Sequence, residues 1–173
     1  TDERFVIWTT TPWTIPANLA ICLNPRFEYA VVNTEKGKLI VLSTMVDKLC
    51  DKFHLEQREI IKTYRGQELE NITVKHPFYD RTSVIILGDH VTDEDGTGCV
   101  HTAPGHGMED FIVGLKYGLP AYCPVDEKGC MMEEAGDFLQ GQFVTDANKT
   151  VTNKLDELGN LLALEWVTHS YPH

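Results

Sequence analysis

The feature that most constrains the fold of this chain is a series of short β-branched and aromatic segments, each interrupted within a few residues by glycine, proline or polar turn residues. Segments of this kind favour β-strands, and their spacing leaves room for only a few helices. The sequence therefore predicts an α+β domain built on a strongly curved sheet or barrel. We expect strands at residues 4–10, 19–23, 29–34, 38–43, 59–64, 72–75, 83–87, 99–102 and 161–168.

Two helices are expected in the first two thirds of the chain. Residues 44–53 place apolar side chains on one face. Residues 108–117 have a similar spacing, which predicts that Phe111, Ile112 and Leu115 point into the core. Both helices should therefore cover the sheet with an apolar face.

The last third of the chain contains the clearest helical pattern. We expect Asp146 to cap a helix that ends at Gly159, because apolar residues repeat at helical spacing between these positions. Residues 129–141 precede this helix and show no regular period, with apolar residues scattered among acidic ones. They are expected to form a surface loop.

Composition narrows the class of protein. The 15 basic and 26 acidic residues give a net charge of -11, which would repel a long stretch of nucleic acid, so any such contact should be small and local. The five cysteines are odd in number and lack a CxxC pair, which argues against a zinc ribbon or disulfide framework. No apolar run approaches the roughly 20 residues of a membrane span, and no signal peptide pattern is present. We expect a soluble, cytoplasmic, monomeric protein without membrane contact.

The length and the two ends bear on domain organisation. A chain of 173 residues fits one domain with a core of its own. The first residue is not methionine, and the last residues carry neither a helix cap nor a polar tail. We interpret residues 1–173 as a single domain excised from a larger chain.

The first segment with chemical potential is WTTTPWTIPAN, residues 8–18, which places four hydroxyls and a carboxamide between two indoles. Threonine hydroxyls donate and accept hydrogen bonds without charge, so they can hold a water, a ribose hydroxyl or an ester carbonyl. A threonine cannot act as a general base near neutral pH, so chemistry here would need a positioned water. The structural alternative is that the threonines are strand residues and the tryptophans belong to the core.

The second segment is GTGCVHTAPGHGMEDF, residues 96–111, which combines two histidines, an acidic residue and several glycines. Glycines permit positive φ and let backbone amides approach a ligand. Asp110 falls where a helix is expected to begin, and a carboxylate near a pocket would pair with an α-ammonium group through charge-assisted hydrogen bonds. His101 lies at the end of a strand, where a lone histidine is more often a satisfied polar residue than a catalyst.

This segment contains residue types that also occur in three other kinds of site. His101, His106 and Asp110 have the ligand types of a metal site, but they lack the helical spacing of a metalloprotease motif. Cys99 shares a strand face with His101, yet neither an orienting third group nor a nucleophile elbow is evident. A phosphate loop would require a lysine and a hydroxyl residue after the glycines. We expect no metal and no cofactor.

Taken in order along the whole chain, the two segments resemble the signature segments of the editing domain, connective peptide 1, of isoleucyl-tRNA synthetases. The terminal THSYPH, residues 168–173, is similar to the run that returns the chain of this family to its catalytic domain. Valyl and leucyl relatives carry TTRP-type segments in place of TTTPWT. The resemblance implies a β-barrel-centred domain with peripheral helices, inserted in a class I Rossmann catalytic domain.

The resemblance also implies roles for the first segment. Thr9, Thr10 and Thr11 match a threonine-rich wall, with Trp8 beside it and Asn18 near the reactive end. We expect Thr10, Thr11 and Asn18 to serve catalysis, with Trp8 and Thr9 contacting the substrate.

For the second segment, the resemblance implies that His101 helps to exclude isoleucine and that Asp110 holds the ammonium group of the amino acid. His106 matches a family histidine in the substrate pocket to which no specific role is assigned. The expected ligand is the 3′ CCA end of the isoleucine tRNA carrying valine, with valyl-adenylate as a further candidate and the rest of a synthetase as partner.

The implied function is hydrolysis of mischarged valyl-tRNA. A missing methylene changes hydrophobic binding by only about 1 to 3 kcal/mol, a limit for which this synthetase family is a standard example, so a second, size-based sieve is needed. The chain has no ATP-binding motif of the synthetic site, so no aminoacylation is expected from it alone. The alternative is a module that binds the CCA end or an aminoacyl-adenylate without hydrolysing it.

Overall fold

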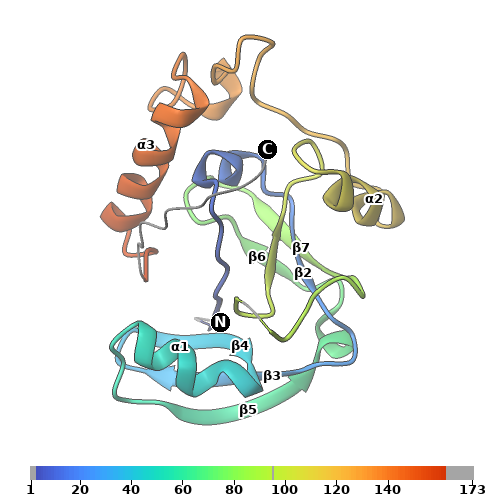
Figure 1. Cartoon of the computed structure of the whole chain (residues 1–173), viewed down its shortest axis with the longest axis vertical. Helices are drawn as coiled ribbons and strands as arrows, with labels where there is room; N and C mark the ends of the chain where they lie inside the picture. The colour runs from blue at the N-terminus through green and yellow to red at the C-terminus, as the bar shows by residue number, and fades with distance from the viewer. Residues whose placement is uncertain (1–2, 95, 163–173) are drawn as a thin grey trace.

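The computed structural model describes residues 3–94 and 96–162 (Figure 1). The helices are α1 (Val46–Lys52), α2 (Met108–Lys116) and α3 (Val144–Glu157), and the 3-10 helices are η1 (Pro12–Ala17), η2 (Ser43–Met45), η3 (Gly66–Leu69) and η4 (Glu133–Ala135). The strands are β1 (Glu3–Phe5), β2 (Ala20–Leu23), β3 (Glu28–Thr34), β4 (Gly37–Leu42), β5 (Glu59–Arg65), β6 (Thr73–Lys75), β7 (Thr82–Leu87) and β8 (Val100–Thr102).

The strands form two mixed four-stranded sheets. Sheet A has the order β1-β4-β3-β5 and sheet B the order β6-β7-β2-β8, with β1–β4 and β2–β7 parallel and the other pairs antiparallel. The predicted α+β class is confirmed. The predicted barrel is replaced by two sheets, because the short edge strands β1, β6 and β8 pair over only three residues each and the described ladders do not close.

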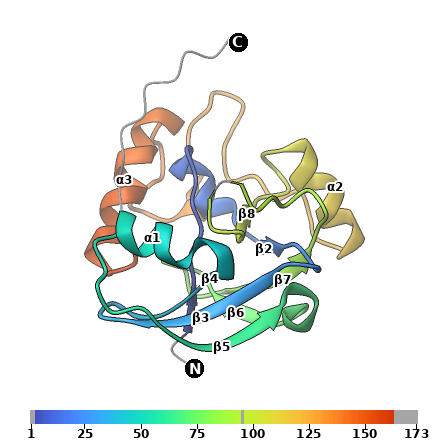
Figure 2. The same ribbon diagram turned by 60° about the horizontal axis from the view of Figure 1, so that its bottom comes forward.

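The main core lies between sheet A, sheet B and α1 (Figure 2). The strands predicted at 29–34 and 38–43 form a hairpin, in which β3 and β4 pair antiparallel from Tyr29 opposite Leu42 to Thr34 opposite Gly37. The apolar face predicted for residues 44–53 is also confirmed, although its first turn is the 3-10 helix η2. The buried residues of this face are Met45, Val46, Leu49 and Cys50.

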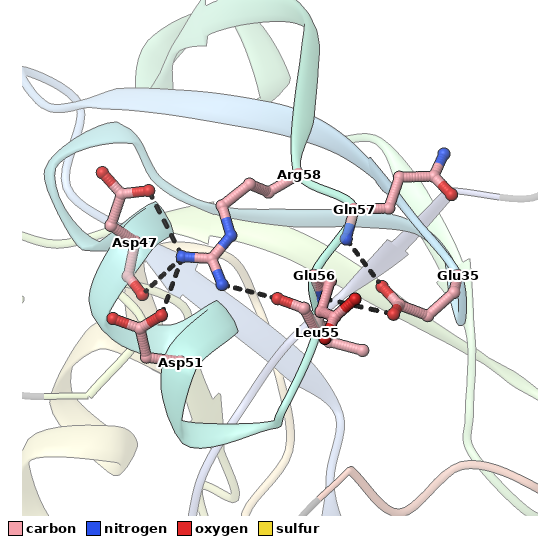
Figure 3. A network of polar contacts seen from close by, with 7 residues as sticks. All are labelled: Glu35, Asp47, Asp51, Leu55, Glu56, Gln57 and Arg58. Atoms are coloured by element: carbon pink, nitrogen blue, oxygen red, sulfur yellow. Dashed lines mark hydrogen bonds and ion pairs between the residues drawn. The ribbon is translucent and has the colours of Figure 1, made fainter.

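A surface network ties α1 to the segment that leads into β5 (Figure 3). The Arg58 guanidinium donates to the Asp51 carboxylate at 2.9 Å and to the Leu55 carbonyl at 2.6 Å. Glu35, in the turn between β3 and β4, accepts the backbone N–H groups of Glu56 and Gln57. Exposed ion pairs contribute only about 0 to 1 kcal/mol, so this network positions a connection more than it stabilises the core.

A second core forms where residues 129–141 were predicted to be a surface loop, so that prediction is wrong. Met131 is 2% exposed and Leu139 0%, and both pack with η1 and α3. The helix α3 begins at Val144, so Asp146 lies in its first turn and is not its cap. Local periodicity could not reveal this core, because its apolar residues are held by irregular backbone and by contacts with distant segments.

The helix α2 presents a different face to the domain from the one predicted. Phe111, Ile112 and Leu115 are exposed by 37%, 52% and 59%. The inward face carries Val113 and Gly114, which are buried against the neighbourhood of sheet B. The prediction failed because apolar residues occur on two adjacent stripes of this helix, and only tertiary packing selects between them.

That inward stripe also carries polar groups at helical spacing. Tyr117 accepts the N–H of Leu87 in sheet B at 3.0 Å and donates to the Glu70 carboxylate at 2.6 Å. Asp110 lies at the other end of the same stripe, since residues seven apart share a helix face. The packing of α2 therefore determines where the Asp110 carboxylate points.

Gly98 offers a test of the loop before β8. Its φ is +80°, and a Cβ there would lie 2.2 Å from Leu42 Cγ in the main core. Gly118 has a φ of +69° with open space around it, so Gly118→Ala isolates the backbone cost of about 1 to 2 kcal/mol. We expect Gly98→Ala to lower the free energy of unfolding in urea by about 1 to 3 kcal/mol more than Gly118→Ala, because the core must also shift. Equal losses would contradict the close packing at Gly98.

Two predictions lie partly or wholly outside the described residues. They are residues 163–168 of the last predicted strand and the segment 168–173. Leu161 and Leu162 are described, and neither belongs to a strand. None of the helices in the described part of the chain is both long and apolar enough to cross a membrane.

Candidate functional site

A cavity of about 230 Å³ brings the two signature segments together. Its walls come from η1 and the segment before it, from β8 and the loop after it, and from the first turn of α2. All the predicted site residues except Asn18 line it. The lining residues are Trp8, Thr9, Thr10, Thr11, Thr14, His101, Ala103, His106 and Asp110.

The threonine wall is shaped by local hydrogen bonds. The Thr9 hydroxyl accepts the backbone N–H of Thr11 at 3.0 Å, and the two hydroxyls lie 3.3 Å apart. Thr10 and Thr11 are exposed. Trp8, which forms a bridge with Val100, is 52% exposed. The wall therefore presents threonine hydroxyls and one exposed indole to a ligand.

Glycines bring the second segment close to this wall, and the first of them has the positive φ expected of glycine. Gly96 has a φ of +74°, and a Cβ there would lie 1.8 Å from Trp8 Nε1. The loop after Ala103 is equally tight, since a Cβ on Gly105 would lie 2.2 Å from the Tyr122 carbonyl oxygen. A larger residue at position 96 would displace Trp8, which lines the cavity, and one at position 105 would displace the backbone of Tyr122.

His101 lies at the back of the cavity with both ring nitrogens engaged. Its Nε2 lies 2.9 Å from the Thr14 hydroxyl, and its Nδ1 lies 2.6 Å from the Asn18 amide nitrogen. Burial, followed by the nearby His106, lowers the pKa of His101 to about 4. The ring is therefore neutral at physiological pH, and it can offer a ligand only its carbon edge or face.

Asn18 lies behind His101 and does not line the cavity. It is 3% exposed, and its amide nitrogen also donates to the Ala20 carbonyl at 3.0 Å. Its amide oxygen accepts from the Ser83 hydroxyl at 2.6 Å. The Asn18 side chain therefore contacts His101 and sheet B, and it reaches the cavity only through His101.

Asp110 is the carboxylate of the cavity. Its Oδ2 accepts the backbone N–H of Ala103 at 3.0 Å, and no partner of its Oδ1 is found in residues 3–94 and 96–162. Burial raises the pKa of Asp110 above its ordinary value, and the hydrogen bond from Ala103 offsets part of this. A half-buried carboxylate favours a positively charged ligand.

His106 packs against the side of the cavity. Its ring meets the Trp13 ring edge to face, with centroids 4.9 Å apart. Its Nε2 is buried and has no hydrogen-bond partner among the described residues. Burial lowers the pKa of His106. These contacts keep Trp13 partly buried, so Trp8 is the exposed indole at this site.

Two lining residues were not predicted from the sequence, Thr14 and Ala103. Thr14 follows Thr11 by three residues, and η1 turns both toward the same side, with the Thr14 hydroxyl donating to the Thr11 carbonyl at 2.9 Å. A 3-10 turn brings positions three apart together, and the two prolines of the motif were a signal for it. Ala103 carries no functional side chain and contributes its backbone.

The nucleophilic alternative does not fit the geometry. Cys99 is 0% exposed, and its thiol points to the Ile40 carbonyl in the main core at 3.7 Å. Burial raises the pKa of the Cys99 thiol far above its usual range. Within the described ranges, no group of three histidine, cysteine, aspartate or glutamate side chains is arranged to hold a metal ion.

Comparison with sequence models of protein families gives no match. Among curated proteins, the chain is 55% identical over 172 residues to isoleucine–tRNA ligase of Bacillus cereus strain AH820, covering 99% of this chain and 19% of that protein. The isoleucine–tRNA ligase of Bacillus anthracis strain A0248 matches equally. The chain thus spans about a fifth of the length of these relatives.

Solved structures agree with the fold. The crystal structure named GlLeuRS-CP1 superposes with a TM-score of 0.71 at 16% identity, over 93% of this chain and 84% of that one. The cytosolic leucyl-tRNA synthetase editing domain of P. falciparum gives 0.67 at 10% identity, over 93% and 79% of the two chains. That of P. knowlesi gives 0.67 at 10% identity, over 90% and 82%. The chain therefore matches a segment of isoleucine–tRNA ligases along almost its whole length and has the fold of the editing (CP1) domains of leucyl-tRNA synthetases.

Proposed function

We propose that this chain is a proofreading domain that hydrolyses valine from mischarged isoleucine tRNA. The observation that carries the proposal is the composition of one cavity. A half-buried carboxylate, Asp110, lines the same cavity as a wall of threonine hydroxyls and a neutral histidine. The similarity to isoleucine–tRNA ligases and the editing-domain fold support the same function.

Asp110 would bind the α-ammonium group of the esterified amino acid. Its Oδ2 is held by Ala103, so the carboxylate is oriented before a ligand arrives. A charge-assisted hydrogen bond of this kind contributes about 1.5 to 3 kcal/mol. The ammonium would fix the amino acid so that its ester carbonyl lies beside the threonine wall.

Water would attack the ester carbonyl without His101 as a base. His101 cannot accept the proton, because Asn18 and Thr14 engage both ring nitrogens. Thr10, Thr11, nearby backbone amides and the free hydroxyl of the terminal adenosine would orient the water and the carbonyl. The oxygen of water joins the carbonyl carbon, the ester C–O bond breaks, and the ribose oxygen leaves with a proton. Asn18 supports this arrangement through His101.

His101 would act as a steric wall in the size sieve. The cavity would admit a valine side chain, whereas the additional methylene of isoleucine would meet the imidazole edge. A binding site discriminates poorly between isoleucine and valine, because their hydrophobic transfer energies differ little. Steric exclusion of isoleucine does not depend on that small difference. His106 would hold the side of the cavity through its contact with Trp13.

The proposed partners follow from the same geometry. The single-stranded CCA end would enter, and exposed Trp8 offers a face on which the terminal base can stack. The acidic net charge of -11 suits a domain that leaves the body of the tRNA to other parts of a synthetase. Valyl-adenylate carries the same ammonium and carbonyl groups and is a further candidate substrate. No cofactor is required.

The competing function is a module that binds an aminoacyl end without hydrolysing it. Two probes separate the functions with this chain alone. The 3′-valyl ester of adenosine reports hydrolysis, and the amide analogue, which cannot be hydrolysed, reports binding by NMR titration. We expect both binding of the amide and release of valine above the rate in buffer. Binding without release would establish the module, and neither binding nor release would overturn both functions.

A further inference from the structure

A buried chain of hydrogen bonds runs from sheet B through His101 to the threonine wall. The Ser83 hydroxyl on β7 donates to the Asn18 amide oxygen at 2.6 Å. The Asn18 amide nitrogen lies 2.6 Å from His101 Nδ1, and His101 Nε2 lies 2.9 Å from the Thr14 hydroxyl. The Thr14 hydroxyl donates to the Thr11 carbonyl at 2.9 Å.

The positions of the protons in this chain follow from the donors and acceptors. An amide nitrogen can only donate, so His101 Nδ1 must accept and carries no proton. The Asn18 amide cannot be reversed, because its nitrogen also faces the Ala20 carbonyl and its oxygen faces the Ser83 hydroxyl. The proton of the neutral ring is therefore on Nε2, which donates to the Thr14 oxygen. Every donor in the chain then has one acceptor.

Three residues of this hydrogen-bond chain are buried and lie in or beside regular elements of the fold. Ser83, Asn18 and Thr14 are 3%, 3% and 8% exposed. Ser83 lies in β7, which pairs with β2 on one side and β6 on the other. The Asn18 carbonyl accepts from the Arg81 guanidinium at 3.1 Å, which fixes the end of η1. The imidazole is thus held between a central strand and a short helix.

We propose that Ser83 and Thr14 are positioning residues that set the amino acid specificity of the cavity, by holding the His101 ring in one orientation and in its Nε2–H tautomer. Ser83 lies outside the cavity and acts through Asn18, whereas Thr14 acts directly on the ring. The specificity part of this inference rests on the proposed editing function. The orientation and tautomer of the ring do not.

The charged and titratable neighbours of the ring are consistent with a neutral His101. His106 on the loop after β8 and His76 after β6 disfavour a second positive charge nearby. The His76 ring has a hydrogen bond of its own, because its Nε2 donates to the Ile15 carbonyl at 2.9 Å. The Arg81 guanidinium contacts the Asn18 backbone, and Asp110 lines the opposite wall. The negative charge of Asp110 would favour protonation of His101. The hydrogen bonds to both ring nitrogens therefore keep the ring neutral.

The first test reads the ring directly by ¹⁵N NMR of the whole chain. Wild type should show the neutral Nε2–H tautomer of His101 from pH 7 down to about pH 5, since ring protonation would leave Asn18 facing a second donor. Ser83→Ala and Thr14→Val should each give a mixture of tautomers or a broadened ring signal. Thr34→Val is the matched control, because Thr34 is also a buried hydroxyl, 5% exposed, and bonds only within the distant hairpin. It should leave the His101 signal unchanged.

The second test reads specificity through binding. The probes are the valyl and isoleucyl 3′-amides of adenosine. Ser83→Ala and Thr14→Val should improve the affinity for the isoleucyl amide relative to the valyl amide about 3- to 10-fold, the effect of one lost hydrogen bond. Thr34→Val should change this ratio less than about twofold.

The outcomes separate the two parts of the inference. An Nδ1–H tautomer in wild type, or an unchanged ring signal in both variants, would overturn the positioning role. An unchanged affinity ratio with an altered ring signal would overturn the link to specificity. If neither amide binds to wild type, the proposed function and the specificity role both fall, while the NMR result still decides the state of the ring.

Discussion

Replacing Asp110 with asparagine is expected to reduce hydrolysis of the 3′-valyl ester of adenosine about 10- to 100-fold. Loss of one charge-assisted hydrogen bond costs about 1.5 to 3 kcal/mol, which corresponds to that range. Asparagine has the same shape as aspartate and can still accept the N–H of Ala103. The loss should therefore reflect the missing charge. It is measured as kcat/KM for the ester.

The same substitution is expected to stabilise the fold at neutral pH. Burial raises the pKa of Asp110 in the folded state, so the folded protein favours the protonated carboxyl. The stability from this group is present at low pH and is lost as the pH rises through the raised pKa, because ionisation then costs more in the folded state. Asp110→Asn should raise the free energy of unfolding in urea at pH 7, and the gain should shrink toward pH 3.

Glu109→Gln is the matched control for both measurements. Glu109 precedes Asp110 in the first turn of α2, but it is exposed and does not line the cavity. Glu109→Gln removes one negative charge, as Asp110→Asn does. It should change ester hydrolysis less than about twofold, as expected of a surface charge in salt. Equal losses for Glu109→Gln and Asp110→Asn would assign the effect to net charge and contradict the anchoring role. If Asp110→Asn stabilises the fold and lowers ester hydrolysis, Asp110 serves function at the expense of folding stability.

The second large effect is expected from His101→Ala. Removal of the imidazole opens the cavity where isoleucine would otherwise meet the ring. The ratio of isoleucyl to valyl ester hydrolysis should then rise about 10- to 200-fold, the discrimination that corresponds to one methylene. The valyl ester is the internal control in each preparation. An unchanged ratio would contradict the steric role.

His101→Ala should also destabilise the domain. The Asn18 amide nitrogen would lose an acceptor in a place with little access to water, which costs about 1 to 3 kcal/mol. The free energy of unfolding in urea at pH 7 measures this loss. Thr14 keeps its bond to the Thr11 carbonyl, so the threonine wall should remain in place. A variant that discriminates poorly yet still hydrolyses the valyl ester is therefore the expected phenotype.

Much of the site could be predicted from the sequence because its residues lie in two short segments. Glycines at positions 96 and 98 indicated a tight loop, and both have positive φ. The threonines and Asp110 have side chains whose chemistry is evident without a fold, and they line one cavity. The alternating and β-branched patterns likewise indicated the strands and the α+β class, since these preferences act over a few residues.

Other features depended on contacts between distant segments. Asn18 and Ser83 are 65 positions apart, and no local pattern indicates that a serine hydroxyl on β7 is linked through Asn18 to a histidine on β8. The apolar residues of α2 allowed two inward faces, and packing chose the one that points Asp110 into the cavity. The sequence by itself determined which groups were available for chemistry, because side-chain type and short-range backbone preference are local. Only the tertiary structure decided which of them meet and in which protonation state, because burial and hydrogen-bond partners come from residues far apart in the chain.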